Sequence, residues 1–297
     1  MLVATSEVRI GAAGVRSTLL FERVVRGTVV RRESLAFDTK YAAAASGKPE
    51  PVGHLFLLLT GRWVHDTGEV FTGPVGFLLA DDEMERPHKG VRSFRTDGER
   101  VDVVQLRIAK PSLRAPIGLA HGPVELPPAG WDAVRSLVAA APRGDATLLA
   151  HVMAALASAG IVETAITETV IAEEPERFRR LWTALEPLYS TYGATTSLKQ
   201  LAGSLGMSMR QVGRDAKELS AVFGIGGGYR DALLMLRLRL AVLLLSAPEA
   251  TVAEVAKLVG YGSPIALARA CRDAKLPSPS AIQEGLRQPA ALAANRI

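Results

Sequence analysis

The sequence predicts an α+β protein, with a β-rich first half and an all-α second half. From Leu19 to about Lys110, short β-branched or apolar runs alternate with turn dipeptides, as in a small β-barrel or jelly roll. After Pro127-Pro128, apolar residues recur at helical spacing. Charge divides in the same way. Counting Lys, Arg, Asp and Glu, residues 1–175 carry −2 and residues 176–297 carry +7, which suggests that the second half meets a polyanion.

Composition narrows the class of protein. The 297 residues, 48% hydrophobic and 22% charged, suit two globular domains and exclude collagen-like or largely disordered chains. The single cysteine, Cys271, excludes an internal disulfide framework and a zinc site built on several thiolates, and we expect it to be a small buried residue. No secretory signal is recognisable, and the apolar stretch Ala232–Ala247 is broken by Arg237 and Arg239. We therefore expect a cytoplasmic protein with no membrane contact.

Four segments of the first half are expected to be strands, and residues 1–125 to form one domain. The expected strands are Val24–Val30, His54–Thr60, Val70–Leu79 and Val101–Ile108, with turns at Thr60-Gly61, Thr67-Gly68, Gly73-Pro74 and Asp97-Gly98.

A helical linker is expected over residues 126–174. Trp131–Ala141 and Asp145–Ala159 have apolar residues at helical spacing, and Asp145 is placed to cap the second helix. The amphipathic run Glu173–Tyr192 then leads into an all-α domain over residues 175–297.

The first motif of that domain is a helix-turn-helix. Ser197–Leu205 ends at the turn residue Gly206, and Ser208–Ser220 forms the second helix. Its inward residues are expected to be Val212, Ala216 and Leu219, and its polar residues are Arg210, Gln211, Arg214 and Lys217. Arg and Gln can form bidentate hydrogen bonds with purine edges, while Ser208 could cap the helix or contact a phosphate.

A second unit of the same pattern follows. The long helix Arg230–Ser246 leads to Thr251–Val259, the turn Gly260-Tyr261-Gly262 and a helix near Pro264–Lys275. The sequence therefore predicts two helix-turn-helix units joined by a long helix.

This pair of units resembles the AraC/XylS family of bacterial transcription regulators over about residues 175–287. The residues that carry the resemblance are Leu201-Ala202, Leu205-Gly206-Met207-Ser208, Arg210, Arg214, Phe223-Gly224, Arg237-Leu238, Ala241, Val252, Val255-Ala256, Val259-Gly260-Tyr261, Ser263, Leu267, Arg269 and Ser278-Pro279. The resemblance implies a sequence-specific regulator that binds double-stranded DNA, a cupin-like N-terminal barrel that binds a small effector, and a homodimer formed by the linker helices.

The second unit departs from the family pattern. Its recognition helix begins Pro264-Ile265-Ala266, where small polar residues are usual, and Gly226-Gly227-Gly228 replaces the usual Ser-Pro. Cys271 and Lys275 stand at two aromatic core positions. We expect Ser263, Arg269 and Arg272 to hold the DNA backbone while Arg210, Gln211 and Arg214 read bases and Lys217 neutralises phosphate. Loss of DNA contact by the second unit is the alternative.

Effector and dimer contacts follow from the resemblance. The barrel residues expected to meet an effector are Trp63, His65, Phe77, His88, Arg92 and Arg95, with the two arginines suited to an anionic group; Phe71 and Phe94 are candidates for packing. A role of the aromatic residues as plain core is the alternative. The residues expected at a dimer interface are Leu148, Val152 and Leu156, unless these helices pack onto their own barrel.

Other classes of function are less well matched. A cupin-type metalloenzyme would need a close histidine pair, whereas His54, His65 and His88 stand apart, and only a distant assembly with Glu69 remains open. No Ser-His-Asp spacing, P-loop or dinucleotide fingerprint is present. We expect no enzyme activity, metal or cofactor. The alternatives are a family-like protein that acts through a protein partner, as the apolar start of the second recognition helix suggests, and a metalloenzyme fused to a DNA-binding domain.

Overall fold

The computed structural model describes residues 2–10, 13–22, 28–35, 52–65, 68–80, 94–96, 101–140, 146–168, 175–190, 196–222, 227–245, 247 and 249–287. Within these ranges the chain is α+β, with antiparallel sheets first and helices after them, as predicted. The strands are β1 Leu2–Ile10, β2 Ala13–Glu22, β3 Thr28–Leu35, β4 Val52–Thr60, β5 Arg62–His65, β6 Val70–Thr72, β7 Val75–Ala80, β8 Phe94–Thr96 and β9 Val101–Ala109.

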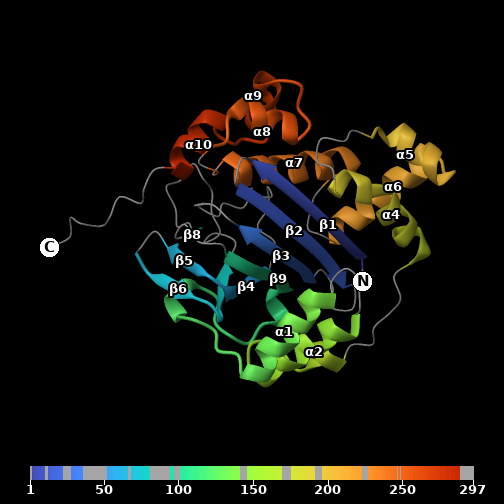
Figure 1. Ribbon diagram of the computed structural model, residues 1–297. Coiled ribbons are helices and arrows are strands. Elements are labelled where there is room, and N and C mark those ends of the chain that lie inside the picture. The colour runs from blue at the N-terminus through green and yellow to red at the C-terminus, as the bar shows by residue number, and fades with distance from the viewer. Residues whose placement is uncertain are drawn as a thin grey trace.

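The described strands form two open sheets. One has the order β1-β2-β3-β9-β4-β7 and the other the order β6-β5-β8 (Figure 1). They do not close into a barrel, so the predicted barrel is not seen in the described part of the chain. The expected strand Val70–Leu79 is two strands, divided at Gly73-Pro74. Of the expected Val24–Val30, only residues 28–30 lie in a described strand.

The hairpin of β1 and β2 was not predicted. The two strands pair antiparallel from Leu2 opposite Phe21 to Ile10 opposite Ala13. Charged residues at every second position of β1, at Glu7 and Arg9, are compatible with a strand because successive side chains alternate between the two faces of a sheet.

Strand β4 is buried on both faces, which explains its nearly continuous apolar sequence. Leu55, Leu57 and Leu59 belong to one apolar cluster, together with helices α1 and α2. Phe56 and Leu58 belong to another, which contains side chains of the second sheet. The six-stranded sheet therefore separates a helical layer from an aromatic layer.

Helices α1 (Pro128–Ala140) and α2 (Ala146–Ser158) cover the first of these faces (Figure 1). Val152 and Leu156 of α2 are fully buried in this chain, and Leu148 is half-buried against the same cluster. The expectation that these side chains pair two subunits is therefore corrected: the apolar stripe is covered by the chain's own sheet. Asp145, the expected cap of α2, lies outside the described residues.

The remaining α-helices follow in chain order. Their bounds are α3 Ala165–Glu168, α4 Glu176–Ser190, α5 Leu198–Leu205, α6 Met209–Val222, α7 Tyr229–Leu245, α8 Val252–Leu258, α9 Pro264–Asp273 and α10 Pro279–Arg287. In Figure 1, α7 runs between the group of α4, α5 and α6 and the group of α8, α9 and α10. Among the described helices, none has the length and apolarity needed to cross a membrane.

One apolar cluster is shared by the two halves of the chain. It contains Phe77 and Val103 of the large sheet together with Leu238 and Leu245 of α7, and it continues into α8, α9 and α10. Helices α7, α8, α9 and α10 are thus part of the same core as the aromatic face of the sheet, whereas α4, α5 and α6 pack in a separate cluster.

Candidate nucleic-acid interface

Both ends of α5 are fixed by local hydrogen bonds. The backbone N–H of Gln200 donates to Ser197 Oγ at 3.2 Å, and the backbone N–H of Ser197 donates to Gln200 Oε1 at 2.8 Å, which completes a capping box. At the other end, Gly206 is left-handed, with φ of 63°, and its N–H returns to the carbonyl oxygens of Ala202 and Gly203. These contacts end α5 where the sequence predicts and turn the chain toward α6.

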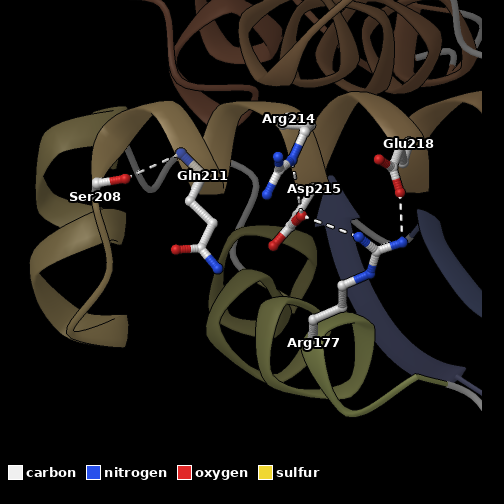
Figure 2. A network of polar contacts seen from close by, with 6 residues as sticks. All are labelled: Arg177, Ser208, Gln211, Arg214, Asp215 and Glu218. Carbon is white, nitrogen blue, oxygen red and sulfur yellow. Dashed lines mark hydrogen bonds and ion pairs between the residues drawn. The ribbon is translucent and has the colours of Figure 1, made fainter.

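Helix α6 begins at a serine cap and buries one face. The backbone N–H of Gln211 donates to Ser208 Oγ at 3.2 Å (Figure 2). The predicted inward positions are confirmed as buried: Val212, Ala216 and Leu219. They join α4 and α5 in a compact cluster whose other buried members are Phe178, Leu181, Leu201 and Ala202.

The opposite side of α6 carries exposed polar side chains. Arg210, Gln211, Arg214 and Lys217 are all exposed. Residues spaced by three, four or seven positions share one side of a helix, so the three basic residues line up along its length. The buried inner face and the caps hold this row in place.

A buried carboxylate lies at the centre of α6. The Asp215 side chain is 3% exposed, and its Oδ1 is 3.5 Å from Arg177 Nη1 and 3.9 Å from Arg214 Nε (Figure 2). Arg177 Nη2 also donates to Glu218 Oε2 at 2.6 Å. Among the described residues, Asp215 Oδ1 has no hydrogen-bond donor, so its charge is balanced by the two guanidinium groups.

This network was not predicted from the sequence. Asp215 falls on the inward stripe of α6, between Val212 and Leu219, and it carries a charge there. A buried acid at such a position signals a basic partner on the helix it packs against. That partner is Arg177, whose guanidinium also lies 4.8 Å from the centre of the Phe178 ring.

Helix α4 connects α6 to the sheet. It contacts β1 as well as α5 and α6. Because Arg177 lies in the first turn of α4, its ion pairs tie the part of the chain next to the sheet to the helix that carries Arg214.

The second helix pair repeats these local features. Thr251 Oγ1 accepts from the backbone N–H of Glu254 at 3.1 Å and caps α8, while Ser263 Oγ accepts from the backbone N–H of Ala266 at 3.2 Å and caps α9. Gly260, with φ of 83°, lies in the turn between the two helices.

Aligning Ser263 on Ser208, since each caps its helix in the same way, pairs the positions of α9 with those of α6. Buried positions coincide, as Leu267 with Val212 and Cys271 with Ala216. Exposed basic positions coincide, as Arg269 with Arg214 and Arg272 with Lys217. At the second position of the helix, however, Ile265 takes the place of Arg210.

Helix α7 is tied to both pairs. The Tyr229 hydroxyl donates to the carbonyl oxygen of Thr196 at 2.6 Å, just before α5, and burial raises the pKa of Tyr229. Farther along α7, the Arg237 guanidinium lies 6.0 Å from the centre of the Tyr261 ring, in the turn between α8 and α9. These two contacts fix the separation of the helix pairs.

Cys271 is buried in α9, as expected. Burial raises the pKa of its thiol to about 11. The thiol is therefore protonated at neutral pH, whereas nucleophilic attack requires the thiolate.

Three of the six residues expected to meet an effector have side chains that the structure describes. Trp63, His65 and Phe77 are buried. The ring centres of Trp63 and Phe77 are 5.8 Å apart, and Phe56 lies 5.9 Å and 5.6 Å from them, respectively. Arg95 lies in β8, opposite Val64, whereas His88 and Arg92 lie outside the described residues.

Buried polar side chains lie beside this aromatic layer. The side chains of His54 and Gln105, on adjacent strands β4 and β9, are 3.0 Å apart and hydrogen-bonded. Within the described ranges, no group of three His, Cys, Asp or Glu residues could hold a metal ion.

Comparisons with known proteins give limited similarity. No protein-family model and no curated protein matches the chain. Among solved structures, it is similar to a DNA-binding transcriptional dual regulator from Escherichia coli K-12, with 21% identity and a TM-score of 0.30 over 38% of this chain and 94% of that chain. It is also similar to ToxT from Vibrio cholerae, with 10% identity and a TM-score of 0.36 over 87% of this chain and 98% of that chain. A fatty acid-bound ToxT gives 14% identity and a TM-score of 0.34 over 87% and 95%.

Proposed function

We propose that the protein is a transcription regulator that binds double-stranded DNA and reads the major groove with α6. The observation that carries this proposal is the exposed row on a helix with a capped start and a buried inner face: Arg210, Gln211, Arg214 and Lys217. We take α5 with α6, and α8 with α9, as two helix-turn-helix units.

The roles of the exposed residues follow from their chemistry. Arg210, Gln211 and Arg214 would hydrogen-bond base edges, because guanidinium and amide groups match the acceptor and donor patterns of guanine and adenine. The residues assigned to the phosphate backbone are Lys217, Arg269, Arg272 and the hydroxyl groups of Ser208 and Ser263. The net charge of +7 over residues 176–297 favours a polyanion.

We infer that the first half of the chain responds to a small effector at the aromatic face of the sheet, near Trp63, His65 and Phe77. What supports this is the apolar cluster that joins Phe77 to Leu238 of α7. An effector would change DNA affinity only by the difference in its affinity for two arrangements of the chain. A homodimer, which stays a prediction, would need a surface other than the buried Val152 and Leu156.

The direct test is selection of duplexes from a random library by the full-length protein, followed by affinity measurements at about 50 and 200 mM salt. The proposal expects one enriched sequence and an affinity that falls steeply with salt, because phosphate contacts release counterions. Absence of enrichment would refute sequence reading and favour the alternative of a regulator that acts through a protein partner.

Two variants separate base contacts from phosphate contacts. Arg210→Ala should cost about 1–3 kcal/mol on the selected duplex and relax preference at one base pair, whereas Lys217→Ala should weaken all duplexes alike. Arg135→Ala is the matched control, because Arg135 is an exposed arginine on α1 that pairs with Asp132 at 2.9 Å. Equal behaviour of the Arg210 and Arg135 variants would refute the assignment of α6.

A further inference from the structure

We propose that Ile265 reads the methyl group of a thymine in the major groove, so that the second helix pair recognises sequence by apolar contact rather than by hydrogen bonds. This inference rests on the proposed DNA binding. It assigns a base-reading role to a helix whose first turn offers no polar side chain beyond its capping serine.

The position of Ile265 carries the first step. It is the second residue of α9, directly after Pro264, and its side chain is 74% exposed. By alignment of the serine caps, it corresponds to Arg210 of α6, and the buried faces of the two helices correspond as well. If α6 presents Arg210 to a base edge, α9 presents Ile265 at the equivalent place.

The chemistry of the major groove supplies the second step. Of the groups that base pairs present there, the thymine C5-methyl is the apolar one, and apolar side chains contact it. Ile265 lies between Pro264 and Ala266, with Gly262 three residues before it and Ala268 three residues after it. A branched alkyl group that stands clear of small neighbours can reach a methyl group on the groove floor.

Charge around Ile265 favours DNA over a protein surface. Arg269 and Arg272 are exposed on the same helix, and they match Arg214 and Lys217 of α6. Arg269 lies in the second half of α9 and Arg272 in its last turn, and exposed arginines suit the phosphates that flank a groove.

The apolar surface itself is too small for a protein docking patch. Among the described residues, the large exposed hydrophobic side chains are Val70, Met209 and Ile265. Hot spots in protein interfaces lie in well-packed, desolvated clusters rather than on a single exposed side chain.

The test uses deoxyuridine, which differs from thymidine only by the missing methyl group. Each thymine of the duplex selected by the full-length protein is replaced singly by uracil, and binding is measured with the wild type and with Ile265→Ala. We expect that, at one thymine, replacement by uracil weakens wild-type binding about fourfold. This is the change in affinity expected for the loss of one buried methyl-sized group. At that thymine, uracil should have no effect on Ile265→Ala.

Matched variants make the result specific. Ile265→Val keeps a branched alkyl group and should keep the uracil penalty at that thymine. Val70→Ala removes an apolar side chain that is 45% exposed on β6, and it should leave every penalty unchanged. Ile265→Arg, which gives α9 the residue found in α6, should shift the preferred base from thymine to guanine.

Two failures are distinguishable. Equal uracil penalties for wild type and Ile265→Ala at every position would overturn this inference and leave the DNA-binding proposal intact. A library that yields no enriched duplex would overturn the proposed function and this inference with it.

Discussion

Replacing Arg177 by methionine should destabilise the whole chain, because it leaves the Asp215 carboxylate buried with less compensation. At 3.5 Å and an effective dielectric constant of about 20, the Arg177–Asp215 attraction is about 5 kcal/mol before the cost of desolvation. Arg177 is 41% exposed, and Arg214 still lies 3.9 Å from the carboxylate, so the net loss is smaller than for a fully buried pair. We expect a decrease of about 2 kcal/mol in the free energy of unfolding.

The assay is urea denaturation of the full-length protein, followed by circular dichroism, with thermal denaturation in parallel. A loss of about 2 kcal/mol corresponds to a decrease of about 3 °C in Tm for a chain of this size. Methionine is chosen because it keeps much of the length of the aliphatic stem and removes the guanidinium group.

Arg179→Met is the matched control on the same helix. Arg179, 50% exposed, pairs at 3.2 Å with Glu176, which is itself exposed, and such a pair contributes about 0–0.5 kcal/mol. Asp215→Asn in the Arg177→Met background should restore part of the lost stability, because it removes the buried charge. Equal stability of the Arg177→Met and Arg179→Met variants would refute the reasoning that the Asp215 charge depends on Arg177.

Three further predictions concern stability and reactivity. Gly206→Ala should lower the free energy of unfolding by about 1 kcal/mol, because a φ of 63° disfavours a side chain. Gly203→Ala within α5 should raise the free energy of unfolding by up to about 1 kcal/mol, because an added Cβ has open space there and alanine favours a helix. Urea denaturation of the two variants measures both changes, and a loss of stability in Gly203→Ala would contradict the second. Leu156→Ala should lower the free energy of unfolding by about 2–5 kcal/mol and leave the mass in solution unchanged, as light scattering would show; a change of oligomeric state would restore the dimer hypothesis for this face. The Cys271 thiol, with its pKa raised to about 11, should react slowly with maleimide at neutral pH until urea unfolds the chain, and rapid labelling of the folded protein would show that its burial is not maintained.

The local features of the second half could be predicted from the sequence because their causes are local. Ser197, Gly206 and Ser208 are side-chain or backbone signals within a few residues of the helix ends they define, and the structure has those ends. The inward positions of α6 follow from helical spacing alone.

Features that depend on distant parts of the chain were missed or misjudged. The apolar stripe of α2 is visible in the sequence, but what covers it is not, and Val152 and Leu156 are buried by the chain's own sheet and α1. In the same way, Asp215 is recognisable as an odd polar residue on a buried stripe, while Arg177 lies on another helix and becomes its partner only through the fold.

The shared apolar cluster makes the second half a poor candidate for separation from the first. A fragment that began at residue 175 would retain Leu238 and Leu245 of α7 but lose Phe77 and Val103, which belong to the same cluster. Apolar side chains left uncovered in this way promote aggregation. Heating the intact chain should accordingly unfold the sheet and helices α7 to α10 in one calorimetric transition, because neither can melt without exposing the apolar side chains of the other.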